Sequence, residues 1–210
     1  CGRVEEVGRG AMTDEKPPKI GRSEGRGETE KDMERRKKTR EEKFMGAAIR
    51  AAKSGLKRGE VPIGAVIVYE DRVVARGYNR RAEKQLASAH AEMMAIDAAC
   101  RKFGSWRLPE GCELYVTLEP CPMCMGAALN ARVDRLYFGA YEQKGRSMTK
   151  ALAEANLLNH RTEVQGGVSE EECSALLTRF FSGLRERQKA AKAAAKNSGN
   201  NLSDGAQTLD

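Results

Sequence analysis

The stretch that decides the fold is residues 113–124, which read Glu-Leu-Tyr-Val-Thr-Leu-Glu-Pro-Cys-Pro-Met-Cys. Its first six residues are mostly apolar or β-branched and predict a buried β-strand. The following Cys-x-x-Cys opens a predicted helix from Cys121 to Ala131. Pro120 is expected at the first helical position, where an N–H would have no partner. The sequence therefore predicts a strand that leads directly into a helix with two cysteines.

The segments on either side continue this alternation of strands and helices. Residues 63–69 and 73–75 flank Glu70-Asp71 and predict a β-hairpin. The order of elements predicts the α/β class, with a central mixed five-stranded sheet flanked by helices in a three-layer α/β/α arrangement. The other expected elements are strands at 135–139 and 162–165, helices at 44–55, 89–102 (capped by Ser88) and 169–189, and a loop at 78–88.

The chain has 210 residues, which corresponds to about one domain with tails. Residues 1–42 lack apolar periodicity and are rich in glycine and charged residues, so we expect a disordered N-terminal extension. Residues 43–188 are predicted to form the folded domain. Residues 189–210 are expected to be a disordered polar tail.

Charge and cysteine content limit the partners and the compartment. The net charge of +7 favours polyanionic partners, although it is a weak indication alone. The six cysteines do not resemble a secreted disulfide framework, which predicts a reducing, cytoplasmic location. The sequence lacks a run of about 18 apolar residues, so no membrane span is expected.

Three residues form a candidate zinc site. His90 stands in Ala-His-Ala-Glu, and Cys121 and Cys124 form the Cys-x-x-Cys, both at predicted helix starts. Imidazole and thiolate are typical zinc ligands, and a helix N-terminus favours thiolate over thiol. Three protein ligands leave the fourth tetrahedral position for water, as in catalytic zinc sites. Glu92 can project over the same cavity and act as the general acid and base.

Simpler interpretations of these residues stay open at this point. The Cys-x-x-Cys could be a redox pair or part of a closed structural site, and Glu92 could be a carboxylate in a helical first turn. The H-x-E and P-C-x-x-C elements are weak alone. Together, in this order, they match the signature of zinc deaminases that act on nucleobases.

The sequence resembles the bacterial tRNA adenosine deaminases of the TadA type over about residues 43–188. The resemblance rests on residues 89–96 and 117–127, and also on 61–66, 77–80, 138–140, 159–161 and the 176–181 helix. It implies a cytidine-deaminase-like fold, one Zn²⁺ per subunit and a homodimer. It further implies that the protein forms inosine at the wobble adenosine in the anticodon loop of tRNA.

The same resemblance implies roles for individual residues. Glu92 would shuttle protons, and Asn79 would contact the flipped base. Ala91, Glu142 and Phe181 would also bind the substrate. Asn79 could instead be a loop residue bonded to its own backbone, and Phe181 could form a dimer contact. His160 is given no zinc role.

The sequence departs from the family at residues 141–150, where the loop is shortened and more basic. Because this loop lies where the family touches its substrate strand, two alternatives to tRNA deamination stay open. One is a deaminase of a small molecule such as cytosine or guanine, with the same zinc chemistry. The other is a non-catalytic, zinc-stabilised RNA-binding subunit. Intact Glu92 argues against the second, because an inactive subunit has no need of a proton shuttle.

Overall fold

The structure, a computed structural model, describes residues 38–142, 149–155 and 160–200, with 194–200 described by backbone only. Strands and helices alternate along the chain, as the sequence predicts. The elements are α2 (Arg40–Leu56), β1 (Gly64–Tyr69), β2 (Arg72–Tyr78), α3 (Arg81–Lys84), α4 (Ala91–Phe103), β3 (Glu113–Leu118), α5 (Pro122–Asn130), β4 (Arg135–Ala140), α6 (Thr149–Glu154), β5 (Glu163–Gln165) and α7 (Glu170–Asn200).

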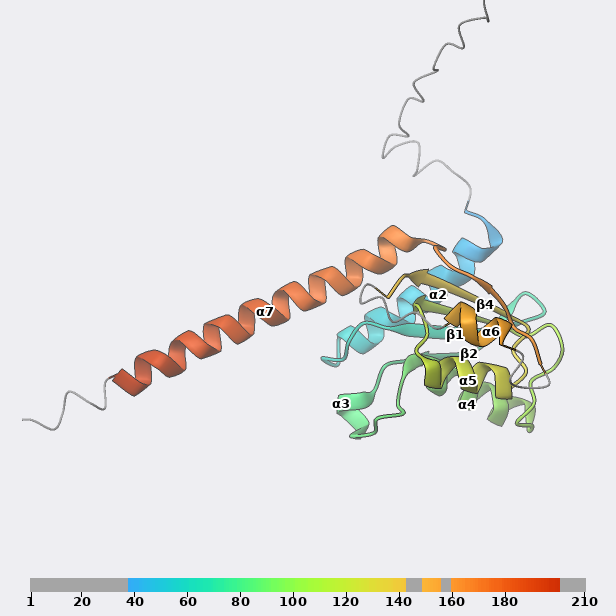
Figure 1. Cartoon of the computed structure of the whole chain (residues 1–210), viewed down its shortest axis with the longest axis horizontal. Helices are drawn as coiled ribbons and strands as arrows, with labels where there is room; N and C mark the ends of the chain where they lie inside the picture. Colours follow the sequence, from blue (N-terminus) through green and yellow to red (C-terminus); the bar gives the residue numbers. More distant parts are fainter. Residues whose placement is uncertain (1–37, 143–148, 156–159, 201–210) are drawn as a thin grey trace, which may run out of the picture. The chain divides into compact units, whose positions relative to one another are not determined.

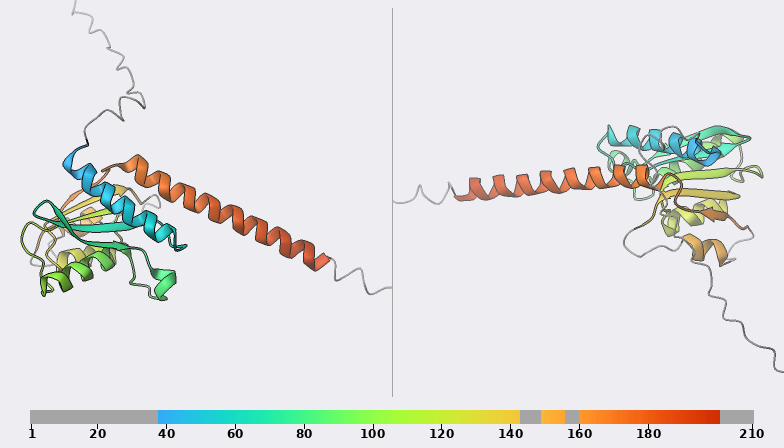
Figure 2. Two further views of the ribbon diagram at one scale, coloured as in Figure 1. Left: turned by 180° about the vertical axis from the view of Figure 1, so that it is seen from behind. Right: turned by 90° about the horizontal axis from the view of Figure 1, so that it is seen from above.

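One sheet organises the domain. Its strands lie in the order β2-β1-β3-β4-β5, and it is mixed. The pairs β1–β2 and β1–β3 are antiparallel, whereas β3–β4 and β4–β5 are parallel. Helix α2 lies on one face and helices α4 and α5 on the other (Figures 1 and 2). The predicted five-stranded mixed sheet in a three-layer arrangement is therefore confirmed.

Alternation along the strands builds two apolar cores, one on each face of the sheet. In β1, Ala65 and Ile67 pack toward α4 and α5, whereas Val66 and Val68 pack toward α2. All four side chains are buried, which explains why this strand reads as a continuous apolar run. The N-terminal turns of α7 join the α2 side through Cys173 and Leu177.

The ends of two helices differ from the sequence predictions. Helix α2 begins at Arg40, because Thr39 and Glu42 form a capping box that pairs free N–H groups of the first turn. The predicted domain start at residue 43 therefore lies inside a helix. Helix α7 continues to Asn200, beyond the predicted end near Lys189. Alanine and lysine are strong helix formers, so the polar composition of this segment does not end the helix.

Two short helices were not predicted. Helix α3 lies within the predicted loop 78–88, and α6 begins at Thr149, inside the loop at 141–150. Neither has the length over which apolar periodicity can be recognised. None of the described helices combines the length and apolar composition that a membrane span requires.

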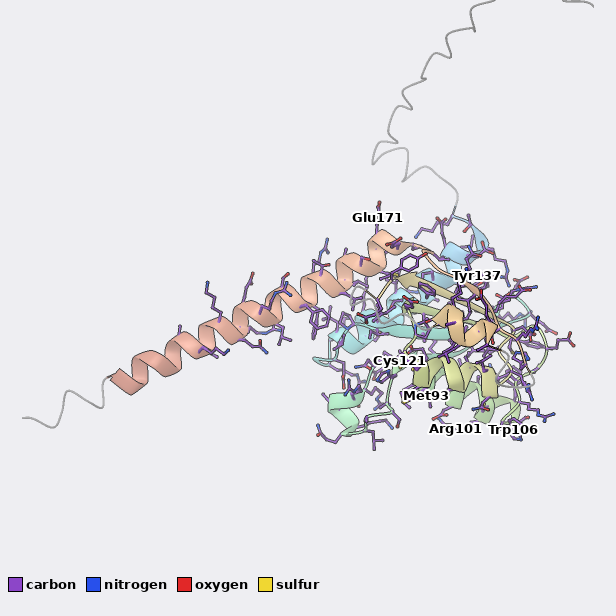
Figure 3. The ribbon with its side chains drawn as sticks, viewed as in Figure 1. Met93, Arg101, Trp106, Cys121, Tyr137 and Glu171 are labelled. Carbon is purple, nitrogen blue, oxygen red and sulfur yellow. The ribbon has the colours of Figure 1, made fainter. Side chains whose placement is uncertain are left out.

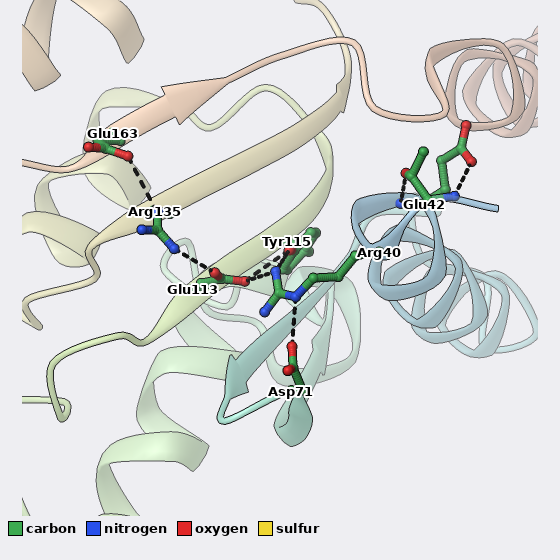
Figure 4. A network of polar contacts seen from close by, with 8 residues as sticks. Arg40, Glu42, Asp71, Glu113, Tyr115, Arg135 and Glu163 are labelled. Atoms are coloured by element: carbon green, nitrogen blue, oxygen red, sulfur yellow. Dashed lines mark hydrogen bonds and ion pairs between the residues drawn. The ribbon is translucent and has the colours of Figure 1, made fainter.

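A buried carboxylate joins several elements at one end of the sheet (Figure 4). Glu113, at the start of β3, accepts hydrogen bonds from Arg40 Nη1 at 2.8 Å, Tyr115 Oη at 2.9 Å and Arg135 Nη1 at 3.2 Å. Arg40 also pairs with Asp71 in the β1–β2 turn. This network lies at the N-terminal ends of β3 and β4, so it leaves their C-terminal ends free for a site.

Gly77 on β2 sets how closely α4 approaches the sheet. A Cβ atom there would lie 2.6 Å from the Ala95 backbone nitrogen and still closer to the Ala91 carbonyl oxygen. Because both atoms belong to the helix backbone, a side-chain rotation cannot relieve the contact. We expect Gly77→Ala to destabilise the fold by about 3 kcal/mol. A midpoint of thermal unfolding lowered by roughly 6–12 °C would confirm this.

Gly126 on α5 provides the matched control, because a Cβ atom added there meets nothing within 4 Å. Gly126→Ala is expected to leave stability unchanged or raise it by about 0.5–1 kcal/mol, since alanine is the better helix former. Equal melting temperatures for Gly77→Ala and Gly126→Ala would contradict the close packing of α4 on β2.

Candidate metal centre and its pocket

The two predicted ligand-bearing helices begin at the ligands themselves. His90 is the N-cap of α4 and Cys121 the N-cap of α5, both with extended backbone. The predictions that Ser88 would cap α4 and that Pro120 would open α5 are therefore wrong; Pro122 occupies the first turn of α5. The His90 side chain makes no capping hydrogen bond to α4, and the Cys121 side chain contacts Cys124 of its own helix, so the three side chains can face a shared point.

The three predicted ligands meet at that point. His90 Nδ1 lies 3.7 Å from Cys121 Sγ and 3.5 Å from Cys124 Sγ. The three ligand atoms all lie within 4.8 Å of one another. A tetrahedral zinc ion would hold a nitrogen and a sulfur ligand about 3.6 Å apart. The donor set and its spacing therefore fit zinc, and Figure 3 shows Cys121 at the start of α5.

The protonation of the group also suits a metal. Hydrogen bonds from Cys124 and His90 lower the pKa of Cys121 to about 3, so this residue is a thiolate at neutral pH. The thiolate hydrogen bond in turn raises the pKa of His90. Sharing a proton with Cys121, together with burial, raises the pKa of Cys124. A cation bound here would replace these shared protons, because thiolate and neutral imidazole are the ligand forms.

Glu92 lies beside the metal group without belonging to it. Its side chain is 4% exposed, in the first turn of α4, and it is hydrogen-bonded to Cys124. Burial raises the pKa of Glu92, which brings a carboxyl group closer to the range in which it both accepts and donates protons near neutral pH.

A pocket of about 610 Å³ opens over His90. Leu118 and Ala140, the last residues of β3 and β4, form part of its wall. It therefore lies at the carboxyl ends of parallel strands, the usual ligand position in open α/β sheets. Three of the predicted substrate-binding residues line the pocket, namely Asn79, Glu142 and Phe181. The other lining residues include Val61 and Ile63 between α2 and β1, Arg81 of α3, and Ser174, Leu177, Thr178 and Arg185 of α7.

Sequence reasoning missed one residue behind the pocket, Glu60. Its side chain is 2% exposed, and its Oε2 accepts a hydrogen bond from Asn79 Nδ2 at 3.2 Å. Its Oε1 accepts one from the Glu83 backbone N–H at 2.7 Å. Since a carboxylate only accepts, it holds the Asn79 amide with its nitrogen toward Glu60. Nothing in the sequence signals this burial, because Glu60 stands in a polar turn.

Other predicted residues lie elsewhere. Ala91 is fully buried in the core under α4, so its side chain does not line the pocket. His160 Nε2 lies 2.8 Å from the Val133 carbonyl oxygen, outside the group formed by His90, Cys121 and Cys124. Glu142, by contrast, lines the pocket, and its backbone N–H donates a hydrogen bond to Glu119 Oε2 at 3.1 Å. The rest of the unusual loop, residues 143–148, lies outside the described residues.

Comparisons with known proteins agree with this geometry. Residues 38–140 match the family described as the cytidine and deoxycytidylate deaminase zinc-binding region. The chain is 48% identical over 156 residues to a tRNA-specific adenosine deaminase of Bacillus subtilis (strain 168), covering 73% of this chain and 96% of that protein.

Two solved structures share the fold. One comes from a study of A-to-I editing by tRNA:A34 deaminases at the wobble position of transfer RNA. It is 42% identical with a TM-score of 0.59, covering 64% of this chain and 99% of that one. The other is a guanine deaminase from Nitrosomonas europaea, 25% identical with a TM-score of 0.58, covering 66% of this chain and 83% of that one. Both carry the predicted cytidine-deaminase-like fold. The extent of the first relative's match, together with the zinc-binding region, shows that this chain belongs to the family of tRNA-specific adenosine deaminases.

Proposed function

We propose that this protein hydrolyses adenosine to inosine at the wobble position of tRNA. The single observation that carries the proposal is the buried Glu92 carboxyl group beside a three-ligand zinc group under an open pocket. The identity to the Bacillus subtilis enzyme supports adenosine in tRNA as the substrate. The likeness to a guanine deaminase is weaker, so deamination of a free base is the less supported alternative.

In this proposal His90, Cys121 and Cys124 hold one zinc ion per subunit. Zinc bound there would act as a Lewis acid and would lower the pKa of the attacking water to about 7. Glu92 would take one proton from the attacking water and deliver it to purine N1, and it would then pass the second water proton to the departing amino group. The water oxygen forms the bond to purine C6, the C6–N bond breaks, and ammonia leaves. A buried carboxyl group with a raised pKa suits both proton steps.

The pocket residues give the base its position. Asn79 offers amide groups to the base, and exposed Phe181 offers a ring for stacking. Glu142 also lines the pocket, and in this proposal its carboxylate accepts a hydrogen bond from the base. Anticodon loops present unstacked bases, so moving the target base into such a pocket costs at most a few kcal/mol. These features support the anticodon loop as the binding partner.

Two further parts of the proposal concern assembly and location. We infer a homodimer from the family resemblance, which sedimentation or light scattering of the purified protein can test. A cytoplasmic location is supported by the cysteines, all of which are free among the residues that the structure describes. Thiolate ligands need a reducing compartment to stay available to a metal.

Glu60 gives a prediction for substrate positioning. In Glu60→Gln the side chain keeps one acceptor and gains a donor, so it cannot accept from both Asn79 and Glu83. We expect kcat/KM for a tRNA substrate to fall about tenfold, since leaving one such group unpaired costs roughly 1–3 kcal/mol. We expect KM to rise and kcat to fall, because a reoriented Asn79 amide both binds the base less well and places it less well for the reaction. The zinc content of the protein should stay unchanged.

Glu83→Gln is the control for this variant. The Glu83 side chain pairs with Arg58 and Arg80 at the surface, and its backbone N–H, which bonds Glu60, is retained. Exposed pairs contribute little, so we expect an activity within about twofold of the wild type. If Glu60→Gln and Glu83→Gln have the same kcat and KM, Glu60 does not position Asn79.

The direct test incubates zinc-loaded protein with a tRNA transcript that has adenosine at the wobble position. A transcript with guanosine there, and free adenosine, cytosine and guanine, serve as comparisons. We expect inosine, read as guanosine on sequencing, only at the wobble adenosine. Ammonia from a free base with untouched tRNA would instead support the small-molecule deaminase. RNA binding without ammonia from any substrate would support the non-catalytic subunit.

A further inference from the structure

Exposed aromatic side chains gather at the pocket. Among the residues that the structure describes, the exposed large aromatic side chains are Trp106, Tyr141 and Phe181. Two of them, Tyr141 at 49% exposed and Phe181 at 40%, line the pocket that opens over His90. Phe181 already has a place in the proposed function, whereas Tyr141 does not. A half-exposed aromatic ring in a pocket offers a flat apolar surface to a ligand.

One buried residue fixes the backbone on both sides of Tyr141. The Glu119 backbone N–H donates a hydrogen bond to the Ala140 carbonyl oxygen at 2.9 Å, and Glu119 Oε2 accepts one from the Glu142 backbone N–H at 3.1 Å. Tyr141 stands between these two bonds, directly after β4. Because Glu119 comes two residues before Cys121, it ties Tyr141 to the chain segment that leads into the metal group.

The Tyr141 ring is also held at its side and at its tip. Its centroid lies 5.1 Å from the centroid of the Phe138 ring, and the two rings meet edge to face at 87°. Its hydroxyl lies against Gly166, where an added Cβ atom would be 2.9 Å from Tyr141 Oη. Tyrosine has only two side-chain torsions, and these contacts restrict them further. Binding a ligand on the exposed part of the ring therefore costs little conformational entropy.

The pocket has room for a second base beside the target base. Its volume of about 610 Å³ lies in the range that holds a drug-sized molecule, which is larger than one nucleobase. The target base has to reach the metal group beside His90. The half-exposed Tyr141 ring is open to a base that stays outside that group.

We propose that Tyr141 stacks against the base of a nucleotide next to the target adenosine. This proposal rests on the proposed function and deepens it, because it assigns a residue to a second nucleotide of the RNA strand. Tyr141 belongs to residues 141–150, where the sequence departs from the family. Every base has a π-face, so an aromatic side chain stacks on any base. Tyr141 therefore favours a strand over a free nucleoside without selecting the sequence of the strand.

The test compares three variants of the full, zinc-loaded chain with the wild type. Tyr141→Leu removes the ring but keeps an apolar side chain, and Tyr141→Phe keeps the ring. Trp106→Leu is the matched control, because it removes an exposed aromatic ring that lies on Arg107, outside the pocket. The probe is an anticodon stem-loop RNA with a wobble adenosine, in which the fluorescent base 2-aminopurine replaces each neighbour of that adenosine in turn.

Three quantities are measured: affinity by fluorescence anisotropy, stacking by the emission of 2-aminopurine, and steady-state deamination. At one of the two positions, bound 2-aminopurine should emit less with the wild type and Tyr141→Phe than with Tyr141→Leu. Tyr141→Leu should bind the stem-loop about tenfold more weakly, since it loses one base–aromatic stack. KM should rise by the same factor with kcat unchanged, because the stack is the same in the ground and transition states.

Two further expectations separate stacking from other causes. The slope of log affinity against log salt should stay the same in Tyr141→Leu, because no charge is removed. Trp106→Leu should match the wild type within about twofold, as is usual for a surface substitution. With an abasic nucleotide at the quenched position, the wild type and Tyr141→Leu should bind equally, because the partner of the ring is gone.

Three outcomes would overturn the proposal: equal affinity of the wild type and Tyr141→Leu for the unmodified stem-loop, equal 2-aminopurine emission in their complexes, or a Tyr141→Phe variant as weak as Tyr141→Leu. A wild type that binds the stem-loop with low 2-aminopurine emission but does not deaminate it would refute the proposed function and leave the stacking proposal standing. A wild type that does not bind the stem-loop would overturn both.

Discussion

Glu92→Gln is expected to lower the rate of deamination by about 10³–10⁴-fold while the protein still folds and binds zinc. Glutamine has nearly the same shape as glutamate, but it cannot accept a proton from water or hand one to the purine ring. The effect should appear in kcat, since proton transfer by Glu92 contributes in the transition state and little to substrate binding. Single-turnover deamination of the wobble-adenosine stem-loop, with inosine counted by sequencing, measures it.

Two measurements separate this chemical loss from a structural one. Zinc per chain should equal that of the wild type, because Glu92 is not among the three grouped ligands. Affinity for the stem-loop should change less than about threefold, since a proton-transfer group contributes mainly in the transition state. A Glu92→Gln enzyme with more than about a tenth of wild-type kcat would show that another group carries the proton.

Removal of the metal is expected to abolish activity altogether. In Cys121→Ala only two of the three ligands remain, and zinc content should fall from one per chain to below about 0.1. Deamination should then fall to the uncatalysed background, because water near neutral pH is a poor nucleophile without a metal ion. Elemental analysis and the stem-loop assay measure the two effects. Treating the wild type with a strong chelator should give the same result, and added zinc should restore activity in the wild type alone.

Cys100→Ala is the matched control for the cysteine substitution. Cys100 lies near the end of α4, and its thiol is 3.6 Å from the Trp106 carbonyl oxygen, outside the metal group. We expect full zinc content and full activity in this variant. Activity that persists in Cys121→Ala after zinc has been lost would exclude the metal from the mechanism.

The strands and the long helices follow from local sequence alone. The β-branched runs of β1 and β3 and the helical spacing in α2 and α4 depend on residues within a few positions of one another. Helix ends were less predictable. Ser88 and Pro120 have the chemistry of helix starts, yet the chain begins α4 and α5 at His90 and Cys121. At these N-caps His90 and Cys121 come together with Cys124, and this meeting of α4 and α5 depends on how the two helices pack.

The sequence by itself determined the candidate groups, with His90, Cys121 and Cys124 as proposed ligands and Glu92 as proposed acid and base, because their types and local spacing predict zinc chemistry. The tertiary structure decided what surrounds them. Glu60 and Asn79 flank the β1–β2 hairpin and are hydrogen-bonded to each other. Helix α7 places Phe181 and Arg185 in the wall of the pocket that His90 lines, although they are about half the chain away in sequence. Local patterns cannot encode such contacts, because they depend on which strands pair and which helix faces the sheet edge. The motifs therefore specify the reaction, and the fold specifies which substrate can reach it.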